Sequence, residues 1–330
     1  MASNLSEKEN FLRQLRGEDY EYVPHSRILM GGSVTNTALP HATGKLQEDG
    51  TILNIFGVEF VNDGGNIPKP GQFMLKDIRK WRDVIKRPAL LDEIDWEKQA
   101  KKDLEGRDDS NTIRVVDSAV SMGYFQALVS FMGFTEALIA VLEEPEEVRE
   151  LLHFLNELNL ENGKKYLQYY KPEMYLGLDD IAHQRAPFVS EEVFLDLFEP
   201  MWRAEVSLFR EAGCYAQHHN CGYFEPFVPF IVDMGYNCWQ PQEMNDIVGL
   251  LKRFKGKFAF SQGLPASFLA RTPAPTEEEV REEVRRVMDL YAPAGSYIFS
   301  GGFARPGDEE AAKRSVWIND EYEKNKFKYF

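Results

Sequence analysis

Short apolar runs that stop abruptly at polar residues or glycine recur along this chain from residue 112 onward, and patterns typical of helices separate them. The spacing of about 20 or 40 residues fits one strand–helix unit, or one unit with additional elements. Such alternation favours a parallel sheet, and 330 residues suit a TIM-type (β/α)8 barrel with an N-terminal extension. An open, doubly wound sheet is the alternative. The runs are Ile113–Asp117, Met174–Asp179, Tyr215–His219, Tyr236–Gln240, Phe258–Gln262 and Tyr297–Ser300.

Residues 1–75 lack this regular alternation of apolar runs and helical patterns. Residues 5–16 have the pattern of an amphipathic helix, and 25–70 are rich in Gly, Asn, Thr and Pro around an apolar run at Ile52–Phe60. We therefore expect a single barrel domain over residues 1–330, with 1–75 as an extension of loops and short strands. Further along, typical start and stop residues delimit the predicted helices: Pro145, Ser190, Gly213, and Thr276 with Glu279.

The composition excludes several classes of protein. The net charge of −15 would repel nucleic acid and anionic lipid, so neither is an expected partner. No apolar run is long enough for a membrane helix, and the polar N-terminus does not resemble a signal peptide. The three cysteines, Cys214, Cys221 and Cys238, do not suggest a disulfide framework. We expect a cytoplasmic protein.

Polar residues follow the apolar runs where the predicted strands end. In a barrel these ends meet at one opening, which is where such enzymes carry their active sites. The segments are Asp117-Ser118, Asp179-Asp180, His219-Asn220-Cys221-Gly222, Gln240-Pro241-Gln242-Glu243, Gln262-Gly263 and Gly301-Gly302.

The segment AQHHNCG carries the densest functional signal. Side chains alternate along a strand, so His219 and Cys221 share one face while His218 takes the other. An imidazole and a thiolate on a common face form half of a zinc site, and a thiolate disfavours magnesium and calcium. A chance H-x-C pair is the alternative. Cys214 and Cys238 are expected to be buried core thiols.

Asp179 and Asp180 are adjacent carboxylates at a strand end. If both were buried they would repel, so one should act as a base, a metal ligand or a charge partner. The alternative is a helix N-cap, a position that aspartate favours. Glu243 is a further carboxylate near the predicted opening.

At these residues the chain resembles the uroporphyrinogen decarboxylase superfamily of TIM barrels, roughly over residues 75–302. True decarboxylases of this superfamily grip a polyanionic porphyrinogen with an N-terminal arginine cluster. Here the corresponding segment is SRILMGGSVTNTALPH, in which Arg27 is the single arginine. The segments that carry the resemblance are KDIRKWRDVIKRPALLDEIDWE, GFTEALIAVLEEPEEVRELL, GLDDIAHQRAPFVSEEVFLDLFEPMWR, HHNCGYFEPFVPFIVDMGYNCWQPQE and LKRFKGKFAFSQGL.

The other branch comprises corrinoid-dependent methyltransferases, which bind zinc through an H-x-C pair and a later cysteine in a G-G-C motif. His219 and Cys221 match the pair, but Phe303 stands where the later cysteine is expected. Glu243 or Asp180 would then complete the zinc site.

The resemblance implies transfer of a methyl group from a small donor, preferably an aryl methyl ether, to a corrinoid (cobalamin) carried by a partner protein, with zinc as Lewis acid. It places Asp180 and His219 in catalysis. The alternatives are a decarboxylase-like lyase or a metal-free small-molecule-binding barrel. We expect Asp179, Gln240, Gln262 and Phe303 to contact the substrate.

Overall fold

A six-stranded parallel sheet forms the centre of the computed structural model, which describes residues 3–330 except 41–43, 49, 63–65, 118, 121–122, 303 and 305–306. The strand order β10-β9-β8-β7-β6-β5 follows the chain, so each strand pairs with its neighbour in sequence. All six strands predicted from the apolar runs are confirmed. They are β5 (Val115–Val116), β6 (Met174–Leu178), β7 (Tyr215–His219), β8 (Cys238–Gln240), β9 (Ala259–Gly263) and β10 (Tyr297–Ser300).

The segment 23–34 closes this sheet into a barrel. It forms a parallel bridge from His25 to Phe299 of β10 and another from Ser33 to Val115 of β5. The six-residue helix α2 (Arg27–Gly32) lies between the two bridges. The predicted TIM-type barrel is therefore confirmed, and one part of its wall is this short segment instead of a long strand.

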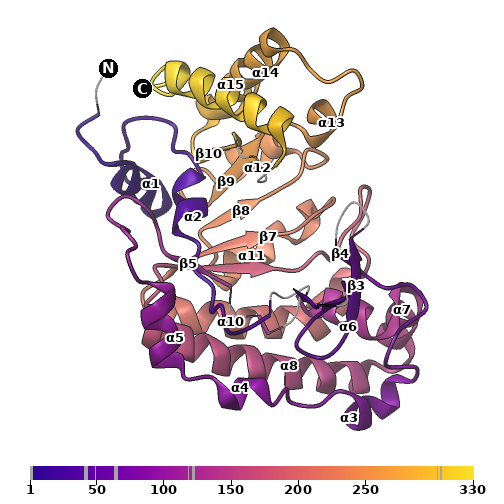
Figure 1. The fold of residues 1–330 in the computed structure, drawn as a ribbon. Coiled ribbons are helices and arrows are strands. Elements are labelled where there is room, and N and C mark those ends of the chain that lie inside the picture. Colours follow the sequence, from indigo (N-terminus) through magenta and orange to yellow (C-terminus); the bar gives the residue numbers. More distant parts are fainter. Residues whose placement is uncertain are drawn as a thin grey trace.

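Helices cover the outside of the sheet, with α14 and α15 on one side and α8 and α10 on the other (Figure 1). The four are α8 (Pro145–Lys165), α10 (Glu199–Glu211), α14 (Glu277–Tyr291) and α15 (Glu309–Asn325). The other helices are α3 (Trp81–Val84), α4 (Leu90–Glu93), α5 (Trp96–Asp103), α6 (Tyr124–Met132), α7 (Phe134–Glu143), α9 (Glu191–Val193), α11 (Val228–Met234), α12 (Ile247–Arg253) and α13 (Ala266–Leu269). Short 3-10 or π turns are η1 (Ile78–Lys80), η2 (Tyr166–Tyr170), η3 (Phe194–Phe198), η4 (Glu225–Phe227) and η5 (Ala292–Ala294).

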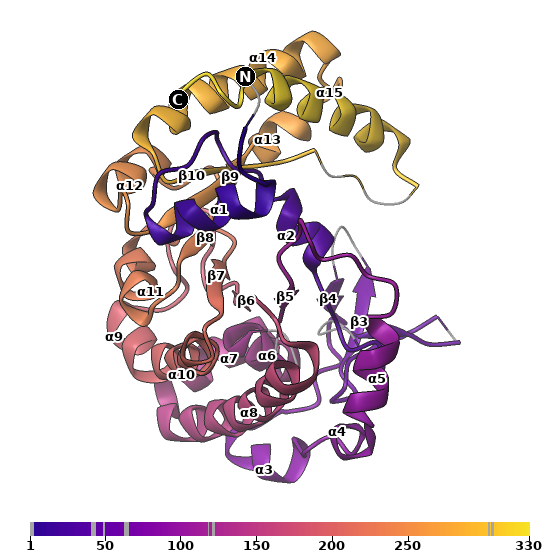
Figure 2. The ribbon, with the colours of Figure 1, turned by 90° about the vertical axis from the view of Figure 1, so that its left-hand side faces the viewer.

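Alternation along the strands divides the core into two parts. One apolar cluster lies inside the barrel and includes Val115, Met174 and Ile298. The helix α1 (Glu7–Arg16) inserts Phe11 and Leu15 into this interior cluster, and Figure 2 shows the helix lying across the strands. The larger cluster fills the layer between the sheet and the outer helices. Residues on one strand therefore face either the barrel interior or the helices, according to their parity.

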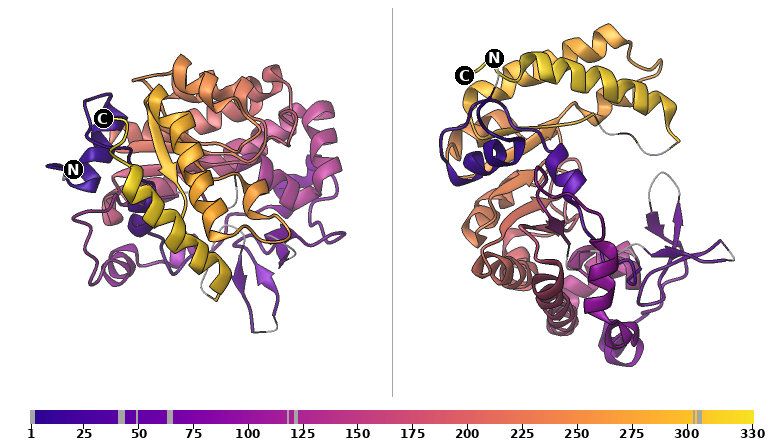
Figure 3. Two further views of the ribbon diagram at one scale, coloured as in Figure 1. Left: turned by 90° about the horizontal axis from the view of Figure 1, so that it is seen from above. Right: turned by 60° about the vertical axis from the view of Figure 1, so that its left-hand side comes forward.

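A small antiparallel sheet projects beside the barrel (Figure 3). It consists of β1 (Lys45–Leu46), β2 (Ile52–Leu53), β3 (Glu59–Asn62) and β4 (Asn66–Pro68). The short strands expected around the apolar run at Ile52–Phe60 are confirmed.

The residues predicted to begin and end helices are found at helix ends in the structure. The Ser190 hydroxyl accepts from the Val193 N–H, and Thr276 and Glu279 form the capping box that opens α14. Pro145 begins α8, and Gly213 follows the end of α10 with φ of 86°. Within the described residues, no single helix is both long and apolar enough to span a membrane. Only α6 and α7 taken together meet that length and composition, and they are bent by 113°.

Candidate metal centre and adjoining cavity

His219 and Cys221 lie together at the C-terminal end of β7, as the alternation predicted. The Cys221 Sγ is 3.6 Å from the His219 Nε2. His218, on the opposite face, is buried against Trp202 and Tyr236 in the helix layer. Cys214 and Cys238 are buried free thiols, which confirms their expected place in the core.

Asp180 completes a group of three candidate ligands. One ligand atom each from Asp180, His219 and Cys221 lies within 4.8 Å of the others. The Asp180 carboxylate accepts from the Cys221 backbone N–H at 2.7 Å and from the Gln126 side-chain amide at 3.1 Å. These two bonds fix its orientation, and each oxygen keeps a lone pair for a cation. Sequence reasoning missed Gln126, because it comes from α6, far away in the chain.

This donor set fits a zinc ion. In tetrahedral geometry, a sulfur at 2.3 Å and a nitrogen at about 2.05 Å from zinc lie about 3.6 Å apart. Burial lowers the pKa of His219, which keeps its imidazole in the neutral, metal-binding form. Burial and the adjacent Asp180 raise the pKa of Cys221 to about 12, so a cation is needed to hold the thiolate. The three side chains therefore form an anionic site that a divalent cation would neutralise.

Gln240 supports the imidazole from the neighbouring strand. It is the register partner of His219, so both side chains face the barrel interior. Its side chain and backbone act to raise the pKa of His219, against the larger effect of burial. The His219 Nδ1 is buried and makes no hydrogen bond of ordinary geometry with the described residues. Gln240 is thus placed to orient the ring.

Asp179 has a structural environment that differs from that of Asp180. Its carboxylate is 1% exposed and accepts from the backbone N–H groups of Phe125 and Gln126 at the start of α6. Burial raises the pKa of Asp179 to about 7, although these N–H groups oppose the shift. Of the two roles considered for this pair, Asp179 caps a helix and Asp180 is placed as a candidate metal ligand.

Glu243 lies outside the three-ligand group. Its carboxylate accepts from the backbone N–H groups of Ala266 and Ser267 at the start of α13. Because β7 and β8 are parallel, Glu243 and His219 do lie at the same end of the barrel. The structure nevertheless brings Asp180, and not Glu243, to the H-x-C pair.

Gln262 faces away from the barrel interior. Its register partner is Phe299, and both lie on the helix side of the sheet with Phe260. Its Nε2 bonds the Gly263 carbonyl oxygen at 3.4 Å, and the side chain is 5% exposed. This position is unfavourable for the predicted substrate contact. Phe303, the other predicted contact after β10, lies outside the described residues.

The loop after Cys221 is held by amide side chains that sequence reasoning did not single out as structural. Gly222 has φ of 87°, and a Cβ there would lie 2.6 Å from the Ala182 carbonyl oxygen. Its N–H donates to Gln242, while Asn245 binds the Phe224 N–H and the Gly222 carbonyl. Glycine is therefore required for the loops after β6 and β7 to approach each other. This approach brings Asp180 to Cys221.

A cavity of about 410 Å³ lies at the ends of β5 and β6. Its floor includes Val115 and Leu176, which belong to or pack against the interior cluster, and Leu178, which is the register partner of His219. The segment 33–40 forms the facing wall. Asp117, at the end of β5, also lines the cavity. The described lining does not include Asp180, His219 or Cys221, and the cavity reaches their strand end through Leu178.

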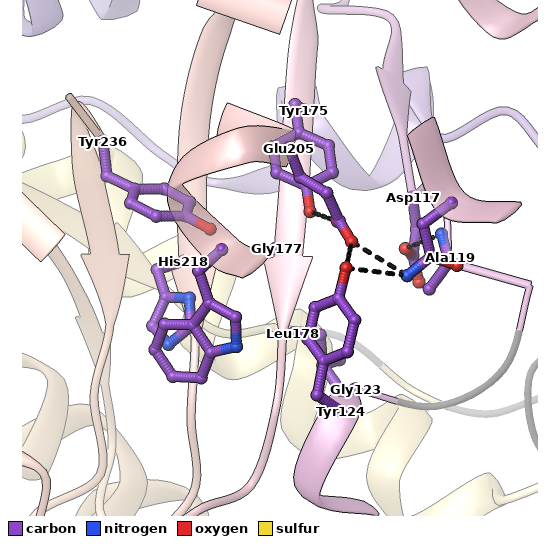
Figure 4. A pocket seen from close by; sticks show the side chains of 12 residues that line it. Asp117, Ala119, Gly123, Tyr124, Tyr175, Gly177, Leu178, Glu205, His218 and Tyr236 are labelled. Atoms are coloured by element: carbon purple, nitrogen blue, oxygen red, sulfur yellow. Dashed lines mark hydrogen bonds between the residues drawn. The ribbon is translucent and has the colours of Figure 1, made fainter. Parts of the chain in front are cut away.

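Behind β6, a buried polar cluster lies in the helix layer (Figure 4). The Glu205 carboxylate accepts from the Tyr124 and Tyr175 hydroxyls and from the Asn159 amide. Burial raises the pKa of Glu205. Figure 4 shows Asp117 beside this cluster, and Glu205 contributes to the raised pKa of Asp117, after burial. Asp117 therefore lines both the cavity and this cluster, and none of the described residues that line the cluster is lysine or arginine.

Arg27 forms salt bridges with Glu7 and Glu323. Arg27 is the single arginine in the segment that corresponds to the arginine cluster of the decarboxylases. It is thus already paired with one glutamate from α1 and one from α15. It offers no free cation to a polyanionic porphyrinogen.

Comparison with known proteins agrees with this architecture. The structure is similar to a solved methyltransferase from Methanosarcina mazei, with a TM-score of 0.64 and 13% sequence identity, over 97% of this chain and 100% of that chain. No curated protein matches the sequence significantly. Residues 58–318, well over half of the chain, match the uroporphyrinogen decarboxylase (URO-D) family, and the chain belongs to this family.

Proposed function

We propose that this chain is a metal-dependent methyltransferase of the URO-D family that moves a methyl group from a small donor to a corrinoid carried by a partner protein. The group of Asp180, His219 and Cys221 is the observation that supports this most. An aryl methyl ether is the preferred donor. The methyltransferase from Methanosarcina mazei supports the proposal through its shared fold. The pairing of Arg27 disfavours the decarboxylase alternative.

When bound, zinc would supply a Lewis acid that polarises a donor oxygen and makes a phenolate a better leaving group. The chain's own residues would hold and orient the ion. Cys221 and Asp180 supply two negative charges, and the neutral His219 supplies a nitrogen ligand. Gln126 and Gln240 keep the carboxylate and the ring in place. The adjoining cavity would hold the donor with its methyl group directed toward the barrel opening, where a partner's corrinoid can approach.

Metal content tests the first part of the proposal. We expect about one zinc per chain after purification without chelator, and Cys221→Ala should lose most of it because the thiolate supplies charge and covalency. The buried Cys214→Ala is the matched control and should keep its zinc. Absence of stoichiometric metal in the wild type, even after zinc addition, would reject the metal site.

Methyl transfer tests the second part. The chain should be inert alone, and cob(I)alamin should be methylated only when an aryl methyl ether and the zinc-loaded protein are both present. His219→Ala should abolish the absorbance change that marks methylation, whereas the exposed His153→Ala in α8 should retain it. Equal rates for His219→Ala and wild type would exclude the metal mechanism. If no aryl ether, methanol or methylamine donor reacts, the methyltransferase proposal fails.

A further inference from the structure

The cavity at the ends of β5 and β6 is lined by acidic and uncharged residues without a basic one among those described. None of its described lining residues is lysine, arginine or histidine, and most of the lining is apolar. Asp117 is its acidic residue. An anionic ligand would meet the Asp117 carboxyl, with Glu205 behind it, and no compensating cation from these residues. The cavity therefore suits a neutral ligand with an apolar body.

Asp117 keeps hydrogen-bonding capacity for such a ligand. Its Oδ1 accepts from the Ala119 N–H at 2.9 Å. Its Oδ2 makes no hydrogen bond within the described part of the chain, and burial raises the pKa of Asp117 to about 7. A carboxyl oxygen in a largely apolar cavity gains free energy when a hydrogen-bond donor reaches it. A ligand that carries a hydroxyl group supplies that donor.

The strand register sets the distance between Asp117 and the candidate metal ligands. Val116 pairs with Tyr175, so Asp117 is level with Leu176, whereas His219 is level with Leu178. His219 is therefore about 7 Å further along the strand direction and about 10 Å across two strand spacings. Asp117 lines the cavity and the His219 side chain faces the barrel interior, so both side chains shorten this gap. One benzene ring with oxygen substituents on opposite sides spans what remains.

We propose that this cavity binds the methyl donor as a neutral aromatic methyl ether that also carries a hydroxyl group, and that Asp117 accepts the hydrogen bond from that hydroxyl. This inference rests on the proposed function and adds a substrate class to it. The ether oxygen then lies toward Asp180, His219 and Cys221, while the hydroxyl lies deeper in the barrel. Methoxybenzoates, which carry a carboxylate, are disfavoured by the same residue. Asp117 is the specificity-determining residue of the site.

Calorimetric titration of the full-length, zinc-treated chain without corrinoid tests this inference, because no turnover occurs. The ligands are 4-methoxyphenol, methoxybenzene and 4-methoxybenzoate. The phenol should bind about 10- to 100-fold more tightly than methoxybenzene, and the benzoate more weakly than both. In Asp117→Ala the preference for the phenol should fall to within about 3-fold. Asp196→Ala, which removes an exposed partner of Arg149, should keep the wild-type preference.

Asp117→Asn gives a second measurement if the alanine variant does not fold. It keeps an acceptor oxygen and the side-chain shape but lacks the charge, so its affinity for 4-methoxybenzoate should rise relative to wild type. An unchanged phenol preference in Asp117→Ala, tightest binding of the benzoate, an unchanged benzoate affinity in Asp117→Asn, or no binding of any ligand would each overturn the inference.

Methyl transfer separates this inference from the proposed function. If the binding pattern is as expected but cob(I)alamin is never methylated, the methyltransferase proposal fails and the role of Asp117 stands. If methylation occurs but Asp117 does not alter the phenol preference, the role of Asp117 fails alone.

Discussion

Asp179 and Asp180 are adjacent in the chain, yet they have opposite surroundings. Asp179 faces the helix layer and caps α6, whereas Asp180 reaches the H-x-C pair of β7. Sequence reasoning left capping and metal binding open for this pair. The choice depends on α6, more than 50 residues earlier in the chain, which no local pattern connects to β6. The same limit explains Gln126, which is helical in sequence and contributes to the site only through the packing of α6.

Gln126→Ala should weaken zinc binding about 10-fold, because outer-shell hydrogen bonds to metal ligands typically contribute this much. Its Nε2 donates to the Asp180 Oδ2, and removal frees the carboxylate to rotate. Competition against a chromogenic chelator measures the affinity. The exposed Gln72→Ala should bind zinc like wild type. Identical affinity for Gln126→Ala would show that Gln126 does not position Asp180.

Asp117→Asn should alter the pH dependence of stability. The pKa of Asp117 is raised from 3.8 to about 7 in the folded chain, by burial first and then by Glu205. Between these values the native state binds a proton that the unfolded state has lost, so this residue's contribution to stability falls as pH rises. As pH rises from about 4 to about 8, the free energy of unfolding of the variant should therefore increase by roughly 1–2 kcal/mol relative to that of the wild type. This is less than the full pKa shift would give, because Asp117 is partly exposed.

Chemical denaturation at several pH values measures this difference. Asp103→Asn serves as a control of opposite sign, since hydrogen bonds from Thr37 and Tyr170 hold the pKa of Asp103 below its usual value against the effect of burial. The prediction would be contradicted if the difference in free energy of unfolding between the wild type and Asp117→Asn did not vary with pH.

At the scale of elements, the close contact of α6 with the end of β6 is the main support for the site. Gly123 precedes α6, and a Cβ there would lie 2.3 Å from the Leu178 carbonyl oxygen and 2.4 Å from the Asp179 Cβ. Gly123→Ala must therefore displace the helix start, which should cost about 2–3 kcal/mol and also lower zinc affinity through Gln126.

Thermal or chemical unfolding and a zinc titration together check this expectation. Gly71→Ala is the comparison, because no atom lies within 4 Å of its Cβ position and φ is 77°. It should cost only about 1 kcal/mol from backbone strain and leave zinc binding intact. If the two variants behave alike, the contact at Gly123 does not support the site.

The strands were predictable because parallel strands are buried on both faces and so form continuous apolar runs. His219 and Cys221 were predictable for a different reason, because side chains two residues apart in an extended segment share one face. Glu243 lies beyond the end of β8, where the direction of a side chain depends on the next helix, whereas Gln262 lies within β9 and its direction follows strand parity. Glu243 caps α13, and Gln262 keeps the parity of Phe260. The segment 23–34 carried no strand signal because only two bridges hold it in the wall.

At the scale of the whole molecule, Arg27 links the first and last described helices. It bonds Glu7 of α1 and Glu323 of α15, and its side chain is 31% exposed. Arg27→Gln should lower the free energy of unfolding by about 1 kcal/mol, since such partly exposed pairs contribute little more. Zinc content and ligand binding should not change. Arg79→Gln, which loses exposed ion pairs with Asp77 and Glu144, should have no measurable effect on unfolding.

Denaturant titration compares the two arginine variants. A loss of zinc or of ligand binding in Arg27→Gln would mean that this segment contributes to the site, as the arginine cluster of the decarboxylases does.

The two bridges of segment 23–34 also determine the order in which the barrel can be completed during synthesis. The Ser26 hydroxyl bonds that of Ser300, 274 residues further along the chain. At ribosomal speeds of about 5–20 residues per second, the segment waits for well over ten seconds before its partner strand emerges. Until then β5 to β9 can form only an open sheet whose β9 edge is exposed, and the emerging chain is most exposed to chaperones at that edge.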